Sequence, residues 1–311
     1  WRFLGHHDSA GRFRIDGVTG PDEYDALVDN NVYTNLMAQQ NLRAAADAVE
    51  RHPEGAEELN VTTEESAAWR DAATAMFLPY DDRLGVHQQS ETYTEHAHWD
   101  FDATRDDQYP LLLHFPYFDL YRKQVVKQAD LVLAMHLRGD AFTAAQKARN
   151  FAYYEQLTVR DSSLSSGPQA VIAAEVAQLE LAHAYIAETA LVDLHDLNHN
   201  TGDGLHLASL ASTWTALVAG LGGMRAAHGV LSFAPRLPVT LTRLAFRLRY
   251  RARQLAVTIT PGSAEYRLLD GPPLAVVHHG ERVELTEGPV VIGIPEEPTP
   301  IPASQPRGRA P

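Results

Sequence analysis

Hydrophobic residues recur at helical spacing through the first two thirds of the chain and at every second position through the last third. Ala-rich helical patterns cover residues 35–51, 64–78, 119–138, 140–157, 168–191 and 205–220. The last pattern ends at the Gly-rich sequence Gly220–Gly223, which is typical of a helix stop. After residue 228 the period falls to two, which predicts strands.

The strands are expected from residue 244 onward. Between 244 and 260, apolar side chains alternate with Arg247, Arg249 and Arg251, as in a strand with one buried face. The sequence 266–285 predicts three further strands, separated by an Asp-Gly-Pro turn and a His-Gly turn. Short strands joined by such turns indicate an antiparallel sandwich or jelly roll.

These patterns predict a mainly α chain with a β appendage. We expect a helical domain over 1–228, a β-sandwich domain over 229–296, and a Pro-rich disordered tail over 297–311. Thr62 or Thr63 is predicted to cap the second helix, and Pro168 to be the first residue of the fifth.

Composition narrows the class of protein. The 311 residues are 45% hydrophobic, enough to bury a large core, and carry a net charge of −14. That charge, spread along the chain, argues against nucleic acid or an anionic membrane as a partner. The sequence has no Cys, and we find no signal peptide and no apolar run of transmembrane length. We expect a cytoplasmic protein.

The chain starts directly on Trp1, without an initiator Met. We therefore expect an upstream polypeptide that completes the protein.

The sequence GVTGPDEYDALVDNNVYTN, residues 17–35, could supply a general acid. It sets Asp22 and Glu23 side by side after a Gly-Pro turn and next to Tyr24. Partial desolvation and an acidic neighbour can raise the pKa of a carboxyl group, as proton donation requires. Alone, the sequence is a weak signal and is more typical of a polar turn before a capped helix.

Lys127 and Gln128 lie side by side within the predicted helix 119–138. Adjacent helical residues do not face the same way, so the plain interpretation is a solvated Lys and a boundary Gln. Both could contact one ligand if they lay near a helix end that lines a concavity.

Two segments could bind an anion. Ser162 and Ser163 precede a Pro-started helix, whose free N–H groups and nearby hydroxyls suit an oxyanion. The alternative needs one Ser, at position 165 or 166, to cap the helix. His206 follows a Gly-Asp-Gly turn, and it is either a cap or surface residue or a donor to the anion.

A metal site is not expected. His96, His98, Asp100 and Asp102 form a His-x-His cluster, but no further ligand cluster is evident in the sequence. We expect no cofactor.

Four ordered sequences together resemble glycoside hydrolase family 65, which contains maltose, kojibiose and trehalose phosphorylases. They are GVTGPDEY…VDNNVYTN, WDFDATRDDQYPLLLHFPYFDLYRKQVVKQADLVLA, DSSLS and DGLHLASLASTWTALVAGLGGMR, spread over roughly residues 10–228. The resemblance implies the latter part of an (α/α)6 toroid followed by a small antiparallel jelly-roll or β-sandwich domain. It also implies a homodimer.

The resemblance assigns roles to individual residues. Glu23 matches the general acid. Lys127 and Gln128 match residues that hold the sugar at the cleaved bond. Ser162, Ser163 and His206 match the phosphate-binding elements. Three departures, Ser212 for Gly, Leu221 for Phe and Gln169 for His, leave the substrate open.

The implied reaction is inverting phosphorolysis of an α-linked glucose disaccharide such as maltose, trehalose or kojibiose. Inorganic phosphate is the co-substrate, and the products are β-glucose 1-phosphate and glucose. An inverting α-glucoside hydrolase on the same scaffold is one alternative. A non-catalytic carbohydrate-binding chain is another.

Overall fold

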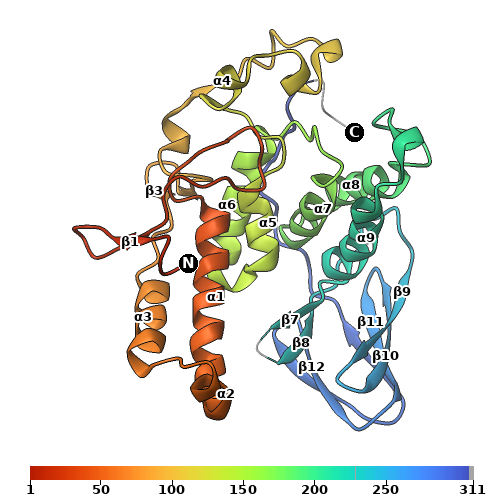
Figure 1. The fold of residues 1–311 in the computed structure, drawn as a ribbon. Helices are drawn as coiled ribbons and strands as arrows, with labels where there is room; N and C mark the ends of the chain where they lie inside the picture. The colour runs from red at the N-terminus through yellow and green to blue at the C-terminus, as the bar shows by residue number, and fades with distance from the viewer. Residues whose placement is uncertain (228, 308–311) are drawn as a thin grey trace. The chain divides into compact units, whose positions relative to one another are not determined.

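The computed structural model describes residues 1–227 and 229–307 and divides into two compact units (Figure 1). The N-terminal unit comprises Trp1–Ser162 together with the chain from Ser304, and the C-terminal unit comprises Ser163–Ala303. Residue 228, the last of the predicted helical domain, and residues 308–311 of the predicted tail lie outside the described residues. The predicted domain boundaries stay predictions.

The N-terminal unit is mainly helical. Its helices are α1 (Val32–Arg51), α2 (Pro53–Glu58), α3 (Thr63–Thr74), α4 (Tyr117–Leu120), α5 (Asp130–Leu137) and α6 (Ala144–Glu155). Single 3-10 turns are η1 (Tyr93–Glu95), η2 (Asp106–Gln108), η3 (Leu111–Leu113) and η4 (Gly139–Ala141). Short strand pairs are β1 (His6–His7) with β2 (Phe13–Arg14), β3 (Tyr80–Asp81) with β4 (Val86–His87), and β5 (Ala97–His98) with β6 (Lys123–Gln124).

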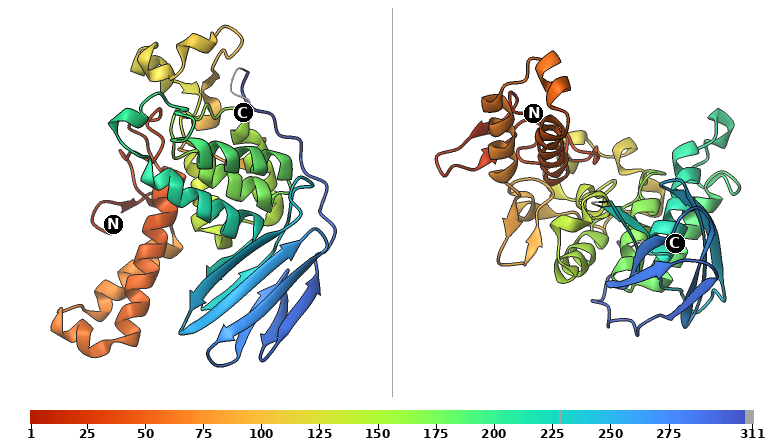
Figure 2. Two further views of the ribbon diagram at one scale, coloured as in Figure 1. Left: turned by 90° about the vertical axis from the view of Figure 1, so that its right-hand side faces the viewer. Right: turned by 90° about the horizontal axis from the view of Figure 1, so that it is seen from below.

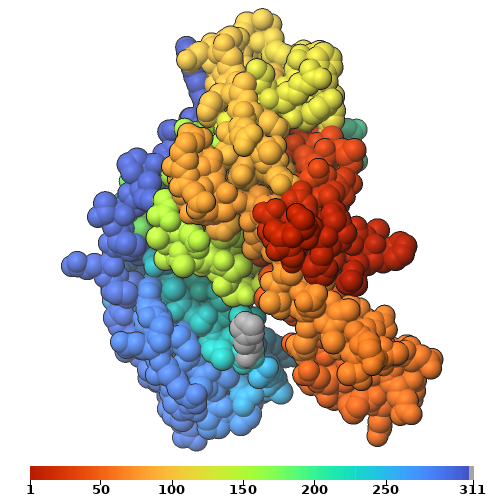
Figure 3. Space-filling model, turned by 90° about the vertical axis from the view of Figure 1, so that its left-hand side faces the viewer, coloured from red at the N-terminus to blue at the C-terminus, as the bar shows by residue number. Residues whose placement is uncertain are grey.

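Helix α1 organises this unit by packing against α3 on one side and α5 on another (Figure 1). Its apolar stripe, including Leu36 and Leu42, is buried, and Phe13 from the β1–β2 hairpin joins the core between α1 and α3. The hairpin itself stands out from the surface (Figure 3). Thr62 caps α3 by accepting the N–H of Glu65 at 3.1 Å, which confirms one of the two predicted caps.

The predicted single helix over 119–138 is wrong. Residues 121–129 separate α4 from α5, and Val126 lies extended beside 157–159. Its N–H donates to Leu157 and its carbonyl accepts from Val159, both at 2.9 Å. Val125 and Val126 are buried in this pairing, so their apolar spacing reflects tertiary contact rather than helical period.

The C-terminal unit begins with helices α7 (Ser166–Glu175), α8 (Leu179–Leu191) and α9 (Leu207–Thr215). The turn η5 (Thr201–Asp203) precedes α9, and the π-helical segment η6 (Ala216–Leu221) follows it. The predicted helix 168–191 is interrupted because Ala177 adopts a left-handed conformation, φ +65°. Helix α7 starts at Ser166, so Pro168 is its third residue and not its first.

Helix α9 reverses the usual amphipathic arrangement. Within its nine residues, all of them described, Ser209 is buried and Leu207 and Trp214 are 72% and 52% exposed. Its apolar side chains therefore face away from the core of their own unit.

The rest of the C-terminal unit is a β-sandwich (Figure 2). Its strands are β7 (Arg225–Ala227), β8 (Val230–Phe233), β9 (Leu244–Tyr250), β10 (Arg253–Thr260), β11 (Ser263–Asp270), β12 (Leu274–His278), β13 (Glu281–Leu285) and β14 (Pro289–Gly293). One sheet has the order β14-β11-β10-β9 and the other β13-β12-β8-β7. Neighbouring strands are antiparallel except β8 and β12, which are parallel. Side chains from both sheets form the core, including Phe233, Val257 and Tyr266.

The predicted alternation over 244–260 is confirmed, but the segment is a hairpin rather than one strand. Arg251 and Ala252, with φ of +48° and +61°, form the turn between β9 and β10. Along β9 the apolar positions face the sandwich core, and Arg247 and Arg249 face outward. The strands and turns predicted over 266–285 are also present.

Part of the Pro-rich segment is described, up to residue 307. Glu297 accepts a hydrogen bond from Arg236 at 2.6 Å, and the carbonyl of Ile301 accepts one from Gln178. Its predicted disorder stays a prediction. Among the described residues, no helix is both long and apolar enough to cross a membrane.

Candidate active site

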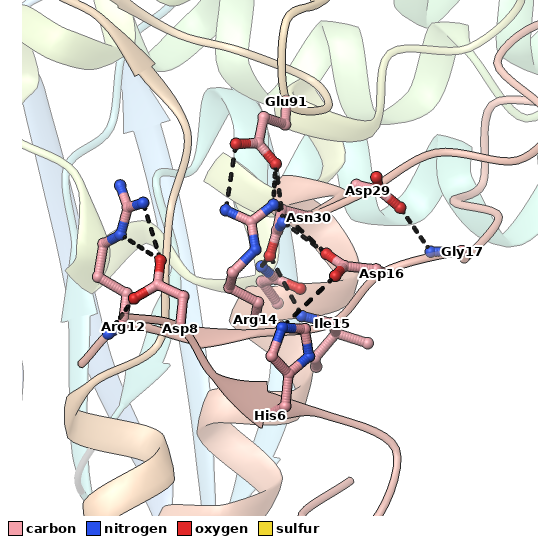
Figure 4. Close-up of polar contacts among 11 residues, drawn as sticks. His6, Asp8, Arg12, Arg14, Ile15, Asp16, Gly17, Asp29, Asn30 and Glu91 are labelled. Atoms are coloured by element: carbon pink, nitrogen blue, oxygen red, sulfur yellow. Dashed lines mark hydrogen bonds and ion pairs between the residues drawn. The ribbon is translucent and has the colours of Figure 1, made fainter. Parts of the chain in front are cut away.

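The sequence 17–31 forms a loop whose two ends are fastened together (Figure 4). The N–H of Ile15 donates to the side chain of Asn30 at 3.1 Å, and that of Gly17 donates to Asp29 at 2.8 Å. Asn30 holds a left-handed conformation, φ +51°, which Asn tolerates better than most residues. The loop therefore leaves the body of the unit and returns to it at one place.

An ion pair reinforces this junction (Figure 4). The guanidinium of Arg14 binds the carboxylate of Glu91 through two nitrogens, and Asn30 donates to both Glu91 and Asp16. The hydrogen bonds from Arg14 lower the pKa of Glu91. The pair therefore joins the base of the loop to the segment that ends at Glu91.

Asp22, near the tip of the loop, points into the protein and is completely buried. One carboxylate oxygen accepts the backbone N–H groups of Lys127 at 2.9 Å and Tyr24 at 3.2 Å. The other accepts from the side-chain amide of Gln89 at 2.7 Å. Burial raises the pKa of Asp22, although these donors oppose that shift by stabilising the charged form.

A second buried carboxylate, Asp130 at the start of α5, supports the first. It accepts the N–H of Asp22 at 2.6 Å and the side-chain amide of Asn31 at 2.6 Å. Gln89 joins the two acids, because its carbonyl oxygen accepts the N–H of Asp130 at 3.2 Å. Burial and the charge of Asp22 raise the pKa of Asp130 well above its ordinary value.

Gly20 allows the loop to approach this network. A Cβ at position 20 would lie 2.0 Å from Oδ2 of Asp130 and 2.5 Å from Nδ2 of Asn31. No side chain fits there, so Gly is required for close packing. Asn31 also caps α1 by accepting the N–H of Thr34 at 3.0 Å, which links the loop to the helix that follows it.

The residues after Glu23 are buried as well. The Tyr24 hydroxyl donates to Asp161 at 2.7 Å, and Asp25 accepts from the hydroxyl of Ser90 at 2.8 Å. Burial raises the pKa of both Tyr24 and Asp25. Between these anchored neighbours, the Glu23 side chain is 58% exposed. The loop thus presents one carboxylate to solvent while holding its neighbours fixed.

Glu23 is paired with Lys127. The Lys127 ammonium binds the Glu23 carboxylate, and the hydroxyl of Tyr117 donates to the Glu23 carbonyl. Gln128, the next residue, donates its side-chain amide to the carbonyl of Pro21. Because residues 127 and 128 precede α5 instead of lying within a helix, both can contact the same loop.

Ser162 extends this chain of contacts. Its hydroxyl donates to the side-chain oxygen of Gln128 at 2.9 Å. Glu23, Lys127, Gln128 and Ser162 are therefore brought together in the N-terminal unit, although they come from three separate segments of the sequence.

Ser163 and His206 belong to the C-terminal unit. His206 stands immediately before α9, and Asp193 accepts both its backbone N–H, at 2.9 Å, and its ring Nδ1, at 2.6 Å. These hydrogen bonds lower the pKa of Asp193. An Nδ1–H donated to Asp193 directs the other ring nitrogen away from it. Ser166 donates to Glu188 at 2.7 Å rather than capping α7.

Sequence reasoning missed the residues that support the site, chiefly Gln89, Asp130, Asp161 and Asp193. Gln89 and Asp130 are 67 and 108 positions from Asp22, and Asp161 is 137 positions from Tyr24. No local pattern signals such contacts. In residues 1–227 and 229–307, no three His, Asp or Glu side chains are grouped as metal ligands would be.

Comparison with known families now identifies the scaffold. Residues 1–215 match the family described as "Glycosyl hydrolase family 65 central catalytic domain", and residues 224–285 match its "C-terminal domain". The chain belongs to glycoside hydrolase family 65. The resemblance inferred from the sequence motifs is confirmed.

The family 65 relatives include uncharacterised and characterised proteins. An "Uncharacterized glycosyl hydrolase" of Mycobacterium tuberculosis is 56% identical over all of this chain and 40% of its own length. An α,α-trehalose phosphorylase of Geobacillus stearothermophilus is 41% identical, over 92% of this chain and 38% of its length. A maltose phosphorylase of Bacillus subtilis is 35% identical, over 88% of this chain and 36% of its own length. The chain thus spans about two fifths of these relatives.

A solved family 65 structure confirms the predicted fold class. A putative kojibiose phosphorylase from the human microbiome superposes with a TM-score of 0.86 at 25% identity, over 95% of this chain and 44% of that one. The mainly α chain with its β-sandwich is therefore the fold of this family's latter part.

Proposed function

We propose that the protein to which this chain belongs catalyses inverting phosphorolysis of an α-linked glucose disaccharide, with Glu23 as the general acid. The observation that carries the proposal is the exposed Glu23 carboxylate, paired with Lys127 and held between buried neighbours. Glu23 is better suited than Asp22 to reach a substrate, because the Asp22 carboxylate is buried and already accepts four donors.

The proposed reaction breaks the bond between the anomeric carbon and the glycosidic oxygen. Glu23 gives its proton to that oxygen, which leaves with the bonding electron pair as the hydroxyl of the released sugar. A phosphate oxygen attacks the anomeric carbon from the opposite face and forms the new bond. Inversion converts the α-glucoside into β-glucose 1-phosphate.

The other residues of the site would bind rather than react. Lys127 and Gln128 would hold the hydroxyl groups of the glucose whose anomeric carbon reacts. The Lys127 ammonium is engaged by Glu23 here, so a bound sugar would have to share or take over that contact. Ser162, Ser163 and His206 would bind phosphate, which needs no cofactor or metal to act as the nucleophile.

The relatives support α,α-trehalose as the first substrate to test. Trehalose phosphorylases of Geobacillus stearothermophilus and Thermoanaerobacter brockii are 41% and 39% identical to this chain. The maltose phosphorylase is 35% identical, and kojibiose phosphorylases are 27% and 30% identical. Trehalose phosphorolysis would give glucose and β-glucose 1-phosphate.

Hydrolysis is the second candidate, because the relatives with 56% identity carry the name glycosyl hydrolase. An inverting hydrolase needs a second carboxylate about 6.5–9.5 Å from the acid to activate water. The two reactions differ in their need for phosphate.

The test uses the complete protein with trehalose, maltose, kojibiose and nigerose, each with and without inorganic phosphate. Phosphorolysis predicts β-glucose 1-phosphate formation that depends on phosphate. Glucose release at the same rate without phosphate would instead establish hydrolysis. Sugar binding seen by calorimetry, with no turnover of any disaccharide, would leave a carbohydrate-binding role.

A further inference from the structure

The proposed reaction uses Glu23 and Lys127 but not the buried carboxylate beside them. We propose that Asp22 is a positioning residue that fixes the general acid and the sugar-binding segment relative to each other. This inference rests on the proposed function, since it assigns a role in the same site. Asp22 itself would touch neither substrate nor phosphate.

Asp22 joins the two segments that carry Glu23 and Lys127. It precedes Glu23 in the chain, so its backbone orients that residue. Its carboxylate accepts the N–H of Lys127 at 2.9 Å, across 105 positions of sequence. Asp22 therefore fixes the backbone positions of both members of the Glu23–Lys127 pair.

Asp22 is itself held through both its backbone and its side chain. Its N–H donates to Asp130 at 2.6 Å, and its second carboxylate oxygen accepts from Gln89 at 2.7 Å. All three side chains are completely buried. A fully satisfied buried polar network of this kind has one arrangement, because each alternative leaves a donor or acceptor without a partner.

Hydrogen bonds fix the orientation of the Gln89 side-chain amide, which also bonds to Asp25. Its nitrogen faces Asp22, and its oxygen accepts the N–H of Asp130 at 3.2 Å. With Asn at position 22, the Asn oxygen can still face Lys127, but the Asn nitrogen then meets the nitrogen of Gln89. Rotating the Gln89 amide would remove that clash and break its contact with Asp130.

This geometry gives a specific rescue. Gln89→Glu in the Asp22→Asn background supplies one oxygen for the Asn nitrogen and another for the N–H of Asp130. The double variant Asp22→Asn/Gln89→Glu keeps the formal charge of the wild type. The single variant Gln89→Glu instead places a carboxylate at position 89 next to the carboxylate of Asp22, so the two charges repel.

The experiment compares wild type, both single variants and the double variant in the complete protein, with trehalose and phosphate. We expect Asp22→Asn to lower kcat about 100-fold, the scale on which a displacement of about 1 Å acts. We expect the double variant to recover about tenfold or more, since directly bonded residues couple strongly. Asp107→Asn, at a side chain 74% exposed, is the matched control and should leave kcat unchanged.

Amide hydrogen exchange of Tyr24 and Lys127 gives a readout independent of turnover. Both N–H groups donate to the same oxygen of Asp22. The clash of the Asn nitrogen with Gln89 should displace that oxygen, so both groups should exchange faster in Asp22→Asn and regain protection in the double variant. Wild-type kcat in Asp22→Asn, or no recovery in the double variant, would overturn the inference.

Failure of the proposed function is distinguishable from failure of this inference. If the wild type acts on no disaccharide, with or without phosphate, the proposed function is wrong, and exchange alone decides the role of Asp22. Unchanged protection of Tyr24 and Lys127 in Asp22→Asn would then overturn it. Lost protection that returns in the double variant would support Asp22 as the residue that positions Glu23 and Lys127.

Discussion

The ammonium group of Lys127 binds the carboxylate of Glu23, a residue 104 positions away in the sequence. The same lysine donates its backbone N–H to Asp22 at 2.9 Å. One residue thus contacts the exposed acid with its side chain and the buried acid with its main chain.

Glu23→Gln should lower kcat for trehalose or maltose phosphorolysis by about 100- to 10,000-fold, because the leaving oxygen would receive no proton. Turnover of α-glucosyl fluoride, measured by fluoride release, should fall much less, since fluoride leaves without protonation. Equal losses on the disaccharide and the fluoride would contradict the role of Glu23 as an acid.

Ser162→Ala and Ser163→Ala should differ. The Ser162 hydroxyl donates its one proton to Gln128, a proposed sugar-binding residue. Ser162→Ala should therefore raise the KM for the disaccharide as well as the KM for phosphate. Ser163→Ala should raise the KM for phosphate alone. Initial rates with each substrate varied in turn measure both. If neither substitution changes the KM for phosphate, these hydroxyls do not bind it.

Asp193→Asn should raise the KM for phosphate about tenfold, the effect of weakening one charge-assisted hydrogen bond. Asp193 accepts both the ring Nδ1 and the backbone N–H of His206, so it orients the imidazole. The kcat at saturating phosphate should change little. An unaltered phosphate KM would indicate that His206 lies outside the phosphate site.

Gly20→Ala should destabilise the protein by about 1–3 kcal/mol, the typical cost of overpacking, because its Cβ would overlap Asp130 and Asn31. Gly55→Ala is the matched control. Position 55 lies in α2 with no atom within 4 Å of a new Cβ, so this change should be neutral or stabilising by up to about 1 kcal/mol. Denaturant unfolding measures both. Equal stabilities would contradict the close approach.

The free energy of unfolding should depend on pH because of the buried carboxyl group of Asp22. Burial raises the pKa of Asp22 from 3.8 to about 7, so the folded state holds a proton that the unfolded chain has released in this range. The free energy of unfolding contributed by Asp22 therefore falls as the pH rises from about 4 to about 7.

Asp22→Asn removes this titration and should flatten the pH dependence. The slope should differ from wild type by up to about 1.4 kcal/mol per pH unit for one proton. Denaturant unfolding at a series of pH values from about 4 to about 8 measures this slope. Asp107→Asn should reproduce the wild-type slope. Parallel curves for wild type and Asp22→Asn would show that Asp22 stays ionised throughout.

The sequence predicted those helices and strands whose hydrophobic period and caps come from their own residues. The apolar stripe of α1, the cap at Thr62 and the alternation along β9 are local properties, and each appears where expected. The prediction of one helix over 119–138 was wrong because Val126 pairs with a residue distant in the sequence, Thr158. An apolar run of this kind fits a buried extended segment and a helix equally well.

The site was predictable only in part. Glu23, Lys127, Gln128 and Ser162 stand in recognisable motifs, and the structure links them by hydrogen bonds and an ion pair. The supporting network depends on which loops meet in the folded unit. Gln89 lies in an unremarkable polar stretch of the sequence, yet it joins Asp22 to Asp130.

The reversed orientation of α9 has an optical consequence. Tryptophan occurs at positions 1, 69, 99 and 214, so Trp214 is the tryptophan of the segment Ser163–Ala303. It is 52% exposed on α9. With the other three replaced by Phe, its emission would be that of a water-exposed indole. A shift of that emission to shorter wavelength would then report any event that covers the helix.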